Sequence, residues 1–328
     1  MTLDFEKEKL IRELKKRKPK RVLVQLAEGI KKYAPEISNW IGALGIEVIF
    51  SGETCWGGCS IAVQEAEALG ADLIVHFGHA QFIESKFPIL YTEIKDLLDL
   101  EPLLKKSLKE LKEFKTVGLS YSVQHRHELK NIINFYEKNK KKVVLSKKLG
   151  YVAYEGHIVG CQYSGLKAIQ NEVDAFVIIG NQFHSMGACL AVEKPVVLID
   201  VYNDKVRSMK GIREKILKQR AFSIEKLREA KNVGIIVEIK PGQRFGSPKI
   251  LLEKFKQAGK NAVVITMNEI TPEKLMNFYN IDAFVELACP RIALDDFAKY
   301  SMPILTYKEA MIALGEKTWK DALKTGFV

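Results

Sequence analysis

The sequence predicts an α/β protein made of three homologous units, each a four-stranded parallel sheet flanked by helices, arranged around a pseudo-threefold axis. Short apolar, β-branched runs alternate with amphipathic helical stretches along all 328 residues, which is typical of parallel sheets covered by helices. A charged helical stretch precedes each group of four apolar runs, and landmark residues recur at equal spacing. A chain of this length can hold two or three domains of about 100–150 residues.

The predicted elements follow the same order in each unit. Unit one, residues 1–100, is expected to contain a helix at 3–17 and strands at 21–26, 48–51, 73–77 and 89–92. Unit two, residues 101–204, is expected to contain a helix at 101–114 and strands at 117–121, 143–145, 175–179 and 196–200. Unit three, residues 205–328, is expected to contain a helix at 210–230 and strands at 233–239, 262–266, 283–287 and 304–306.

The repeat can be counted from two of the cysteines. Cys59 precedes Asp72 by 13 residues, and Cys161 precedes Asp174 by 13 residues. The third unit has the matching aspartate, Asp282, within the similar segment IDAFVELAC. Two cysteines therefore occupy one structural position, the loop that leads toward the third strand of the unit.

The third unit carries its thiol at a different place. Glu269 stands where the spacing would put a cysteine, and Cys289 follows the third strand instead. Because loops at the C-terminal ends of parallel strands line the ligand crevice, Cys59, Cys161 and Cys289 all belong to the functional edge of their units. Cys59 and Cys161 are also expected near the N-termini of helices that start at Ser60 and Ser164, whose dipoles favour the metal-binding thiolate.

Three thiolates can hold a 4Fe-4S cluster and leave one iron open, which suits a substrate-binding enzyme better than an electron carrier. Zinc held by three cysteines and a histidine or water is an alternative, although the only close pair is Cys55 and Cys59. Cys55 and Cys189 are interpreted as buried or spare thiols.

Composition excludes several classes of protein. An odd number of cysteines, five, argues against a secreted disulfide framework. No apolar run reaches the roughly 18 residues that span a bilayer, and the charged N-terminus does not read as a signal peptide, so we expect a cytoplasmic protein. The net charge of +11 could attract nucleic acid or an acidic protein, but no basic stripe with interleaved aromatics predicts direct nucleic-acid binding.

At these residues the chain resembles the archaeal diphthamide-biosynthesis enzymes, the 2-(3-amino-3-carboxypropyl)histidine synthases. The resemblance covers nearly the whole chain. It rests on the segments Gln25-Leu-Ala-Glu28-Gly29, Thr54-Cys-Trp-Gly-Gly-Cys59, His79, Gly160-Cys161, Gly180-Asn-Gln-Phe-His184, Lys240-Pro-Gly242-Gln243-Arg244 and Ala288-Cys-Pro-Arg291-Ile-Ala-Leu-Asp295-Asp. One departure is Ala27, where proline is expected.

The resemblance implies an unconventional radical S-adenosylmethionine reaction. In that family a reduced 4Fe-4S cluster, held by the residues that match Cys59, Cys161 and Cys289, cleaves the Cγ–S bond of S-adenosylmethionine. The resulting 3-amino-3-carboxypropyl radical adds to C2 of a histidine in translation elongation factor 2, the first step of diphthamide formation. Archaeal members are homodimers of three-domain subunits, and an electron donor is implied.

Further site residues are predicted around the cluster. Arg291 would bind the carboxylate of the cosubstrate, although a surface arginine capping a helix is an equal alternative. Gln243 and Gly242 would hydrogen-bond the ligand, with a purely structural Pro-Gly turn as the alternative. Glu28 and Gly29 occupy the corresponding place after the first strand of unit one.

Histidines supply candidate bases. His79, His157 and His184 are expected in the crevice region, where one could accept the C2 proton of the substrate histidine, and a structural role is the alternative for each. His125 and His127 are expected on a charged surface helix.

Two other functions fit the pattern. A quinolinate synthase shares the three-unit fold and three cysteines on one cluster, but the KPGQR and ACPRIALDD segments argue against it. A zinc-stabilised α/β binding module without enzymatic activity is the second alternative.

Overall fold

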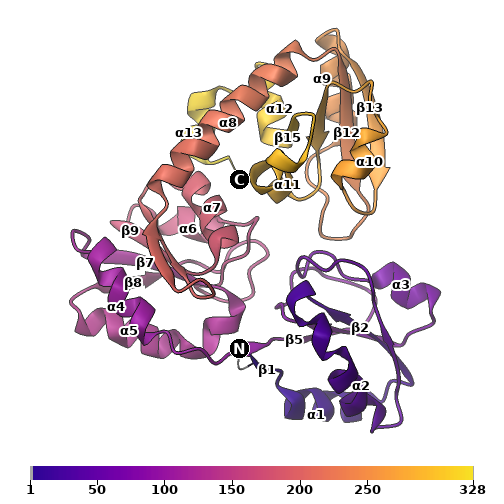
Figure 1. Ribbon diagram of the computed structural model, residues 1–328, viewed down its shortest axis with the longest axis vertical. Coiled ribbons are helices and arrows are strands. Elements are labelled where there is room, and N and C mark those ends of the chain that lie inside the picture. Colours follow the sequence, from indigo (N-terminus) through magenta and orange to yellow (C-terminus); the bar gives the residue numbers. More distant parts are fainter. Residues whose placement is uncertain (1–2, 328) are drawn as a thin grey trace.

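The structure is a computed structural model that describes residues 3–327 and contains three parallel β-sheets (Figure 1). The first sheet has the order β3-β2-β4-β5, formed by β2 (Arg21–Leu26), β3 (Glu47–Phe50), β4 (Leu73–Phe77) and β5 (Ile89–Thr92). The parallel core of the second has the order β8-β7-β9-β10, formed by β7 (Thr116–Tyr121), β8 (Lys142–Leu145), β9 (Ala175–Gly180) and β10 (Val196–Asp200). The third has the order β13-β12-β14-β15, formed by β12 (Asn232–Glu238), β13 (Asn261–Met267), β14 (Ala283–Glu286) and β15 (Ile304–Thr306). The predicted α/β class is confirmed.

Two short antiparallel pairings were not predicted. The second sheet has five strands rather than four, because β11 (Lys205–Ser208) pairs antiparallel with β10. Residues 3–6 are not part of the expected helix: β1 (Leu3–Asp4) pairs with β6 (Lys95–Asp96), and α1 begins only at Lys7. Both pairings use short polar segments, which carry no hydrophobic periodicity to predict them.

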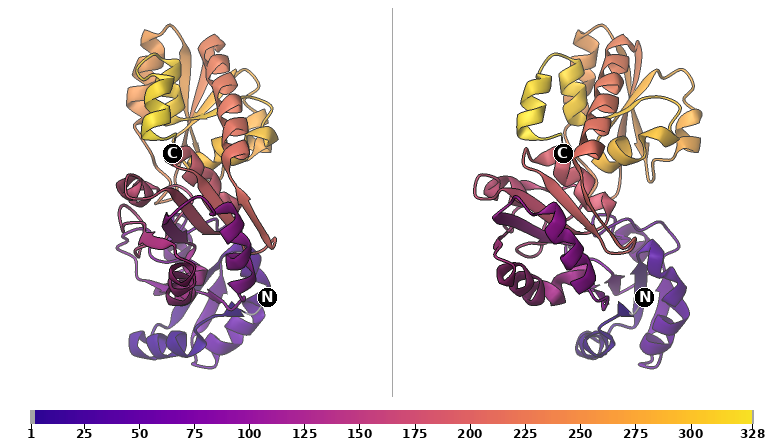
Figure 2. Two further views of the ribbon diagram at one scale, coloured as in Figure 1. Left: turned by 90° about the vertical axis from the view of Figure 1, so that its left-hand side faces the viewer. Right: turned by 60° about the vertical axis from the view of Figure 1, so that its left-hand side comes forward.

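Helices cover the sheets (Figures 1 and 2). They are α1 (Lys7–Arg17), α2 (Ala34–Gly42), α3 (Val63–Ala68), α4 (Glu101–Glu110), α5 (Leu129–Lys138), α6 (Ser164–Ile169), α7 (Gln182–Ala191), α8 (Lys210–Glu229), α9 (Pro248–Gln257), α10 (Pro272–Met276), α11 (Pro290–Asp295), α12 (Tyr307–Ala313) and α13 (Trp319–Thr325). Short 3-10 turns are η1 (Glu28–Tyr33), η2 (Val123–Glu128) and η3 (Phe297–Lys299). Among the residues described, no helix combines the length and the apolar character needed to cross a membrane.

The three repeated aspartates make equivalent hydrogen bonds in the three units. The carboxylates of Asp72, Asp174 and Asp282 each accept two backbone N–H groups at the start of the first strand of their sheet, at 2.7–2.9 Å. These hydrogen bonds lower the pKa of all three carboxyls. The repeat read from the sequence is therefore a repeated tie between the first and third strands.

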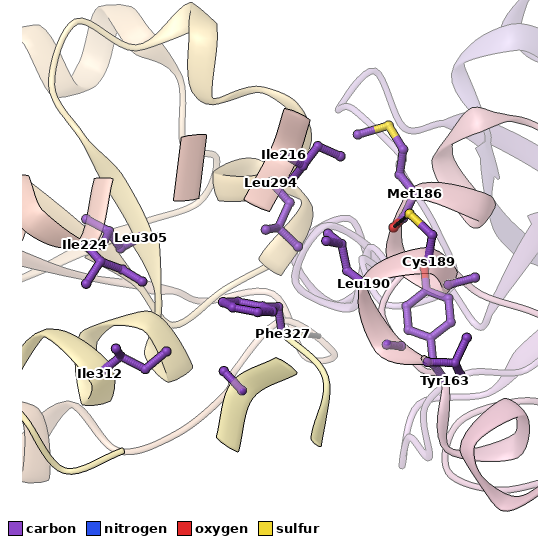
Figure 3. Close-up of a cluster of buried hydrophobic side chains, with 14 of the residues drawn as sticks. Tyr163, Met186, Cys189, Leu190, Ile216, Ile224, Leu294, Leu305, Ile312 and Phe327 are labelled. Atoms are coloured by element: carbon purple, nitrogen blue, oxygen red, sulfur yellow. Dashed lines mark hydrogen bonds between the residues drawn. The ribbon is translucent and has the colours of Figure 1, made fainter. Parts of the chain in front are cut away.

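Units two and three share one hydrophobic core. Side chains of α7 pack against α8 and the C-terminal segment, and Leu190 and Phe327 belong to the same buried cluster as Ile216, Leu294 and Leu305 (Figure 3). Unit one has a separate core around β2 and β4. The shared core sets the position of the second sheet relative to the third. Unit one contacts unit two where β6 lies against η2, and it contacts unit three where the Cys59 carbonyl accepts the Gly242 N–H.

Candidate metal centre

The five cysteines fall into two groups by exposure. Cys55 and Cys189 are each only 2% exposed, whereas Cys59, Cys161 and Cys289 are half-buried and reach the surface of the site. Cys189 lies in the shared core, where its Sγ donates to the carbonyl of Met186 in α7 (Figure 3). Only the three thiols predicted as ligands are thus accessible to a bound group.

Each of these three thiols comes from a loop at the C-terminal edge of a different sheet. Cys59 lies in a turn before α3, Cys161 lies in a turn before α6, and Cys289 is the residue that begins α11 after β14. Burial is the largest cause of the raised pKa of Cys289. The neighbouring Cys161 and Cys59 each raise this pKa further. The three-unit arrangement therefore brings the predicted ligands to one place.

The helix expected at Ser164 after Cys161 is confirmed as α6, whereas the helix expected at Ser60 after Cys59 begins only at Val63. The expectation that helix dipoles lower the pKa of these two thiols is wrong, because burial raises the pKa of both. Burial is the largest influence on Cys161 and raises the pKa of this thiol to about 12. A metal must therefore displace the thiol protons when it binds, as it does at most cysteine sites.

The spacing of the thiols argues against a single zinc ion. Within residues 3–327, the group that brings three ligand atoms within 4.8 Å of one another is Cys55, His76 and His79, and not the three half-buried cysteines. Thiolates that share one zinc at about 2.3 Å lie about 4 Å apart. Cys59, Cys161 and Cys289 are spread more widely, which suits a larger multinuclear cluster.

A loop of unit three packs directly on the Cys59 loop of unit one. The Gly242 N–H donates to the Cys59 carbonyl at 2.9 Å, and a Cβ added at Gly242 would lie 2.7 Å from the Cys59 Cα. Only glycine fits this close approach. The Pro-Gly turn is therefore structural, and it also holds one of the predicted ligands.

Gln243 lies between the Cys59 thiol and a buried carboxylate. In one orientation of its amide, Nε2 donates to Cys59 Sγ at 3.2 Å. In the opposite orientation, Nε2 donates to Oε1 of Glu238 at 2.8 Å. Burial raises the pKa of Glu238, so this carboxyl can also be protonated and donate to the amide oxygen. A thiolate at Cys59 favours the first orientation, because a thiolate accepts hydrogen bonds and cannot donate them.

Replacing Gly242 with alanine is expected to weaken cluster binding about 10–100-fold, the range for changes next to metal ligands. The added methyl group would push the Cys59 backbone away from the other two thiols. The measurement is iron bound per chain in an anaerobic reconstitution titration. Gly211→Ala is the matched control, because nothing lies within 4 Å of a Cβ at that position. Equal iron affinity in the two variants would contradict this role of the loop.

Arg291 is buried and only partly paired. It is 4% exposed, its Nη2 pairs with Asp295, and its guanidinium lies 4.1 Å from the centre of the Phe183 ring. Its Nε and Nη1 are buried without a hydrogen-bond partner. The alternative of a surface arginine is therefore wrong. Two unpaired donors on a buried cation are costly and define a place for an anion.

A buried hydrogen-bond chain leads to His79. Gln25 Nε2 donates to the Ser60 carbonyl at 2.7 Å, so Gln25 Oε1 is the acceptor that faces His76 Nδ1 at 3.0 Å. His76 Nδ1 must then carry the proton, and its bare Nε2 accepts from His79 Nδ1 at 3.0 Å. This leaves a lone pair on His79 Nε2. Burial lowers the pKa of His79 to about 4, which keeps the ring neutral.

Gln25 and His76 were not predicted as site residues. Both are polar residues inside otherwise apolar strands, in VLVQL of β2 and LIVHF of β4. A buried polar side chain in a central strand requires a partner, and this was the signal available in the sequence.

The other histidines differ in their surroundings. Burial lowers the pKa of His184 to about 3, with the charge of Arg291 as the next cause, and its Nδ1 is buried without a partner. His157 Nδ1 accepts from the Ala153 N–H at 3.2 Å. The surface assignment of His125 is wrong, because η2 turns this side chain into the interior, where both ring nitrogens are enclosed.

Glu28 and Gly29 follow β2 in η1. Glu28 Oε1 accepts the Cys55 N–H at 3.0 Å and pairs with Lys31 at 2.7 Å. Gly29 is exposed, and nothing lies within 4 Å of a Cβ added there. The structure thus connects Glu28 to the loop that carries Cys59, four residues beyond Cys55.

The fold and the site define a class: a three-unit α/β protein whose units each place one half-buried thiol after the C-terminal end of a sheet, near a buried, partly unpaired arginine. Residues 26–324 match a family described as "Putative diphthamide synthesis protein", and the chain belongs to this family.

Relatives and solved structures agree with this placement. The chain is 32% identical to the 2-(3-amino-3-carboxypropyl)histidine synthase of Pyrococcus horikoshii, over 96% of this chain and 92% of the relative. It is 28% identical to subunit 1 of the same synthase from Kluyveromyces lactis, over 95% of this chain and 75% of the relative. It also resembles a crystal structure of Dph2 from Pyrococcus horikoshii with a 4Fe-4S cluster, with a TM-score of 0.89 and 31% identity over 97% of this chain and 93% of that one.

Proposed function

We propose that this chain catalyses the first step of diphthamide biosynthesis, the transfer of a 3-amino-3-carboxypropyl group from S-adenosylmethionine to C2 of a histidine in translation elongation factor 2. The observation that carries the proposal is one thiol from each unit beside Arg291, a buried cation with two unpaired donors. The name of the Pyrococcus horikoshii relative supports the reaction.

Cys59, Cys161 and Cys289 would hold the 4Fe-4S cluster, and three ligands leave one iron for the cosubstrate. When bound and reduced, the cluster supplies the electron that breaks the Cγ–S bond of S-adenosylmethionine and releases methylthioadenosine. The donor set fits this group, because the three thiols are accessible and more widely spaced than a single ion requires.

Side chains of this protein bind and orient the reactants. Arg291 would hold the carboxylate of the aminocarboxypropyl arm with its free Nε and Nη1. Gln243 would donate to Cys59 Sγ, and such hydrogen bonds tune a cluster's potential. Gly242 permits the close approach of the two loops, and Glu28 with Gly29 would position the Cys55–Cys59 loop.

Two histidines are proposed to act on the substrate side. After addition at C2, the adduct radical must lose a proton and one electron to restore the imidazole. The lone pair on Nε2 of the neutral His79 would accept the proton, and the electron would return to the cluster that supplied it. His184 would contact the cosubstrate. Burial, followed by the charge of Arg291, lowers the pKa of His184.

We also propose the wider setting of the reaction. The chain would act as a homodimer of subunits divided at residues 1–100, 101–204 and 205–328, in the cytoplasm, without direct contact to nucleic acid or membrane. It would need an electron donor, and the net charge of +11 would favour docking of an acidic surface of the elongation factor.

Replacing Arg291 with lysine is expected to weaken S-adenosylmethionine binding about 10–100-fold while the iron content stays unchanged. A lysine offers a point charge and cannot both pair with Asp295 and present two fixed donors to a carboxylate. Equilibrium binding of S-adenosylmethionine to the reconstituted protein measures the effect. Arg244→Lys, at an exposed arginine of the neighbouring loop, is the control. Unchanged affinity in Arg291→Lys would exclude this carboxylate site.

The test of the proposed function is an anaerobic reaction with dithionite, labelled S-adenosylmethionine and archaeal elongation factor 2. We expect methylthioadenosine in solution and label on the factor. Quinolinate formed from small-acid substrates, with no methylthioadenosine, would favour a quinolinate synthase. Colourless protein that carries zinc after anaerobic purification would favour a zinc-stabilised binding module.

A further inference from the structure

One edge strand of the third sheet is unlike its counterparts in the other two. The repeated strand order places β3, β8 and β13 at the same edge of their sheets. β3 and β8 have four residues each and begin with the charged residues Glu47 and Lys142. β13 has seven residues, NAVVITM, with no charge. Among residues 3–327 no other edge strand is as long.

The side chains of β13 are also unusually exposed. Val263 and Val264 are 42% and 43% exposed, although they point to opposite faces of the sheet. β13 forms the outer edge of unit three, with α10 beside it (Figure 1). Natural proteins protect such edges with charges, prolines or a covering element, because an unprotected edge pairs with other strands. Here the strand carries none of these protections, which indicates that a partner covers it.

The hydrogen-bonding groups that point outward can be identified. The Asn261 N–H donates to Lys231 and the Met267 carbonyl accepts from Ile239, so the odd-numbered residues of β13 face β12. In a strand the N–H and C=O of successive residues point to opposite sides. The outward groups therefore belong to the even-numbered residues of the strand, Ala262, Val264 and Thr266.

These three residues are symmetric about the centre of the strand. If a second copy of β13 runs antiparallel about a twofold axis through Val264, then Val264 lies opposite itself and Ala262 lies opposite Thr266. Each of these pairs can exchange two hydrogen bonds, as narrow pairs of an antiparallel ladder do. The outward groups thus match those of an identical strand, which is the self-complementarity that a twofold interface requires.

Apolar side chains beside the strand extend the surface. Tyr279, 80% exposed, lines the same surface hollow as Asn261 at the start of β13. Met276, the last residue of α10, and Phe278, two residues later, are exposed as well. A stable interface needs about 800 Å² from each partner, more than one strand provides. These side chains supply further apolar area next to the ladder.

We infer that the homodimer is formed by antiparallel pairing of β13 with β13 of a second copy, which joins the two third sheets into one continuous sheet. The inference deepens the homodimer of the proposed function and names its contact surface. This pairing leaves the three thiols free, because β13 is a lateral strand of the third sheet and the thiols lie in loops after β3, β8 and β14.

The first test is Val264→Pro. The Val264 N–H points away from β12, so proline removes only an outward donor and keeps the ladder within the sheet. We expect wild type at twice the chain mass of 37.1 kDa by light scattering, and a rise of about 100-fold in the dimer dissociation constant of the variant. Val48→Pro is the matched control, because Val48 is the outward residue of β3 in unit one, and it should leave the dimer intact.

A charge-swap experiment tests the register without a proline. Val264→Lys and Val264→Glu should each be monomeric, because residue 264 would face an identical charge. An equimolar mixture should recover dimers that contain one chain of each kind. Circular dichroism of every variant verifies that it is folded.

Monomeric wild type, or dimers that persist in Val264→Pro and in both single charge variants, would overturn the inference. Dimers that are lost in Val264→Lys but do not return in the mixture would overturn the register centred on Val264. Oligomeric state is measured without cosubstrate or elongation factor, so a failure of the transfer reaction would not affect this test.

Discussion

Replacing Cys161 with alanine is expected to abolish label transfer from S-adenosylmethionine and to remove nearly all bound iron. The variant would leave two thiolates from units one and three, which cannot hold a cluster at a site built for three. Changes beside metal ligands already cost about 10–100-fold in affinity, and loss of a ligand costs more. Iron content, the visible absorbance of the anaerobic protein and transfer of label to elongation factor 2 measure the effect.

The two buried cysteines are the controls for this prediction. Cys55→Ala and Cys189→Ala should keep full iron content, because both thiols are 2% exposed and lie outside the set of accessible ligands. Loss of iron in Cys55→Ala would instead assign a metal to the group that this residue forms with His76 and His79. Persisting transfer in Cys161→Ala would defeat the mechanism.

Replacing Arg220 with methionine is expected to lower the free energy of unfolding by about 3–5 kcal/mol, because it leaves a buried carboxylate without its partner. Arg220 and Glu309 are both fully buried, and the guanidinium makes two hydrogen bonds to the carboxylate at 2.6 and 2.8 Å. Arg220 also donates to the carbonyls of Ala293 in α11 and Ile304 in β15. It therefore connects α8 to α11, the helix for which Cys289 is the N-cap residue.

Urea unfolding of the anaerobic apoprotein measures this loss. The double variant Arg220→Met with Glu309→Met should recover most of the stability, since a buried ion pair can be replaced by apolar side chains at little cost. Arg228→Met, which breaks an exposed pair with Glu225 on the same helix, should change stability by about 0–1 kcal/mol. A loss below about 1 kcal/mol in Arg220→Met would show that the buried pair contributes little.

The arrangement of the sheets was predictable because its causes are local. The strands of all three parallel sheets were found from runs of apolar, β-branched residues, with ends that differ by at most one residue. The spacing from Cys59 to Asp72 and from Cys161 to Asp174 revealed the repeat, because each aspartate ties the same pair of strands. The antiparallel strand β11 was missed because KVRS carries no apolar pattern and is held by its neighbour β10.

The site was predictable in its chemistry but not in its geometry. The residue types and their place at strand ends pointed to Cys59, Cys161 and Cys289 as ligands. Exposure, which separates these thiols from Cys55 and Cys189, depends on packing between units. The ionisation of the thiols was predicted in the wrong direction, because burial outweighs the effect of helices that begin several residues away.

The sequence by itself determined the class of fold and the threefold repeat, and it singled out the three thiols that we propose as ligands, because periodicity and spacing are properties of neighbouring residues. Only the tertiary structure decided that Arg291 is buried with two free donors, that Gly242 must lack a side chain against Cys59, and that His76 sets the tautomer of His79. Each of these features joins segments far apart in the chain. Burial and hydrogen-bond direction arise only when such segments pack together, so no local pattern records them.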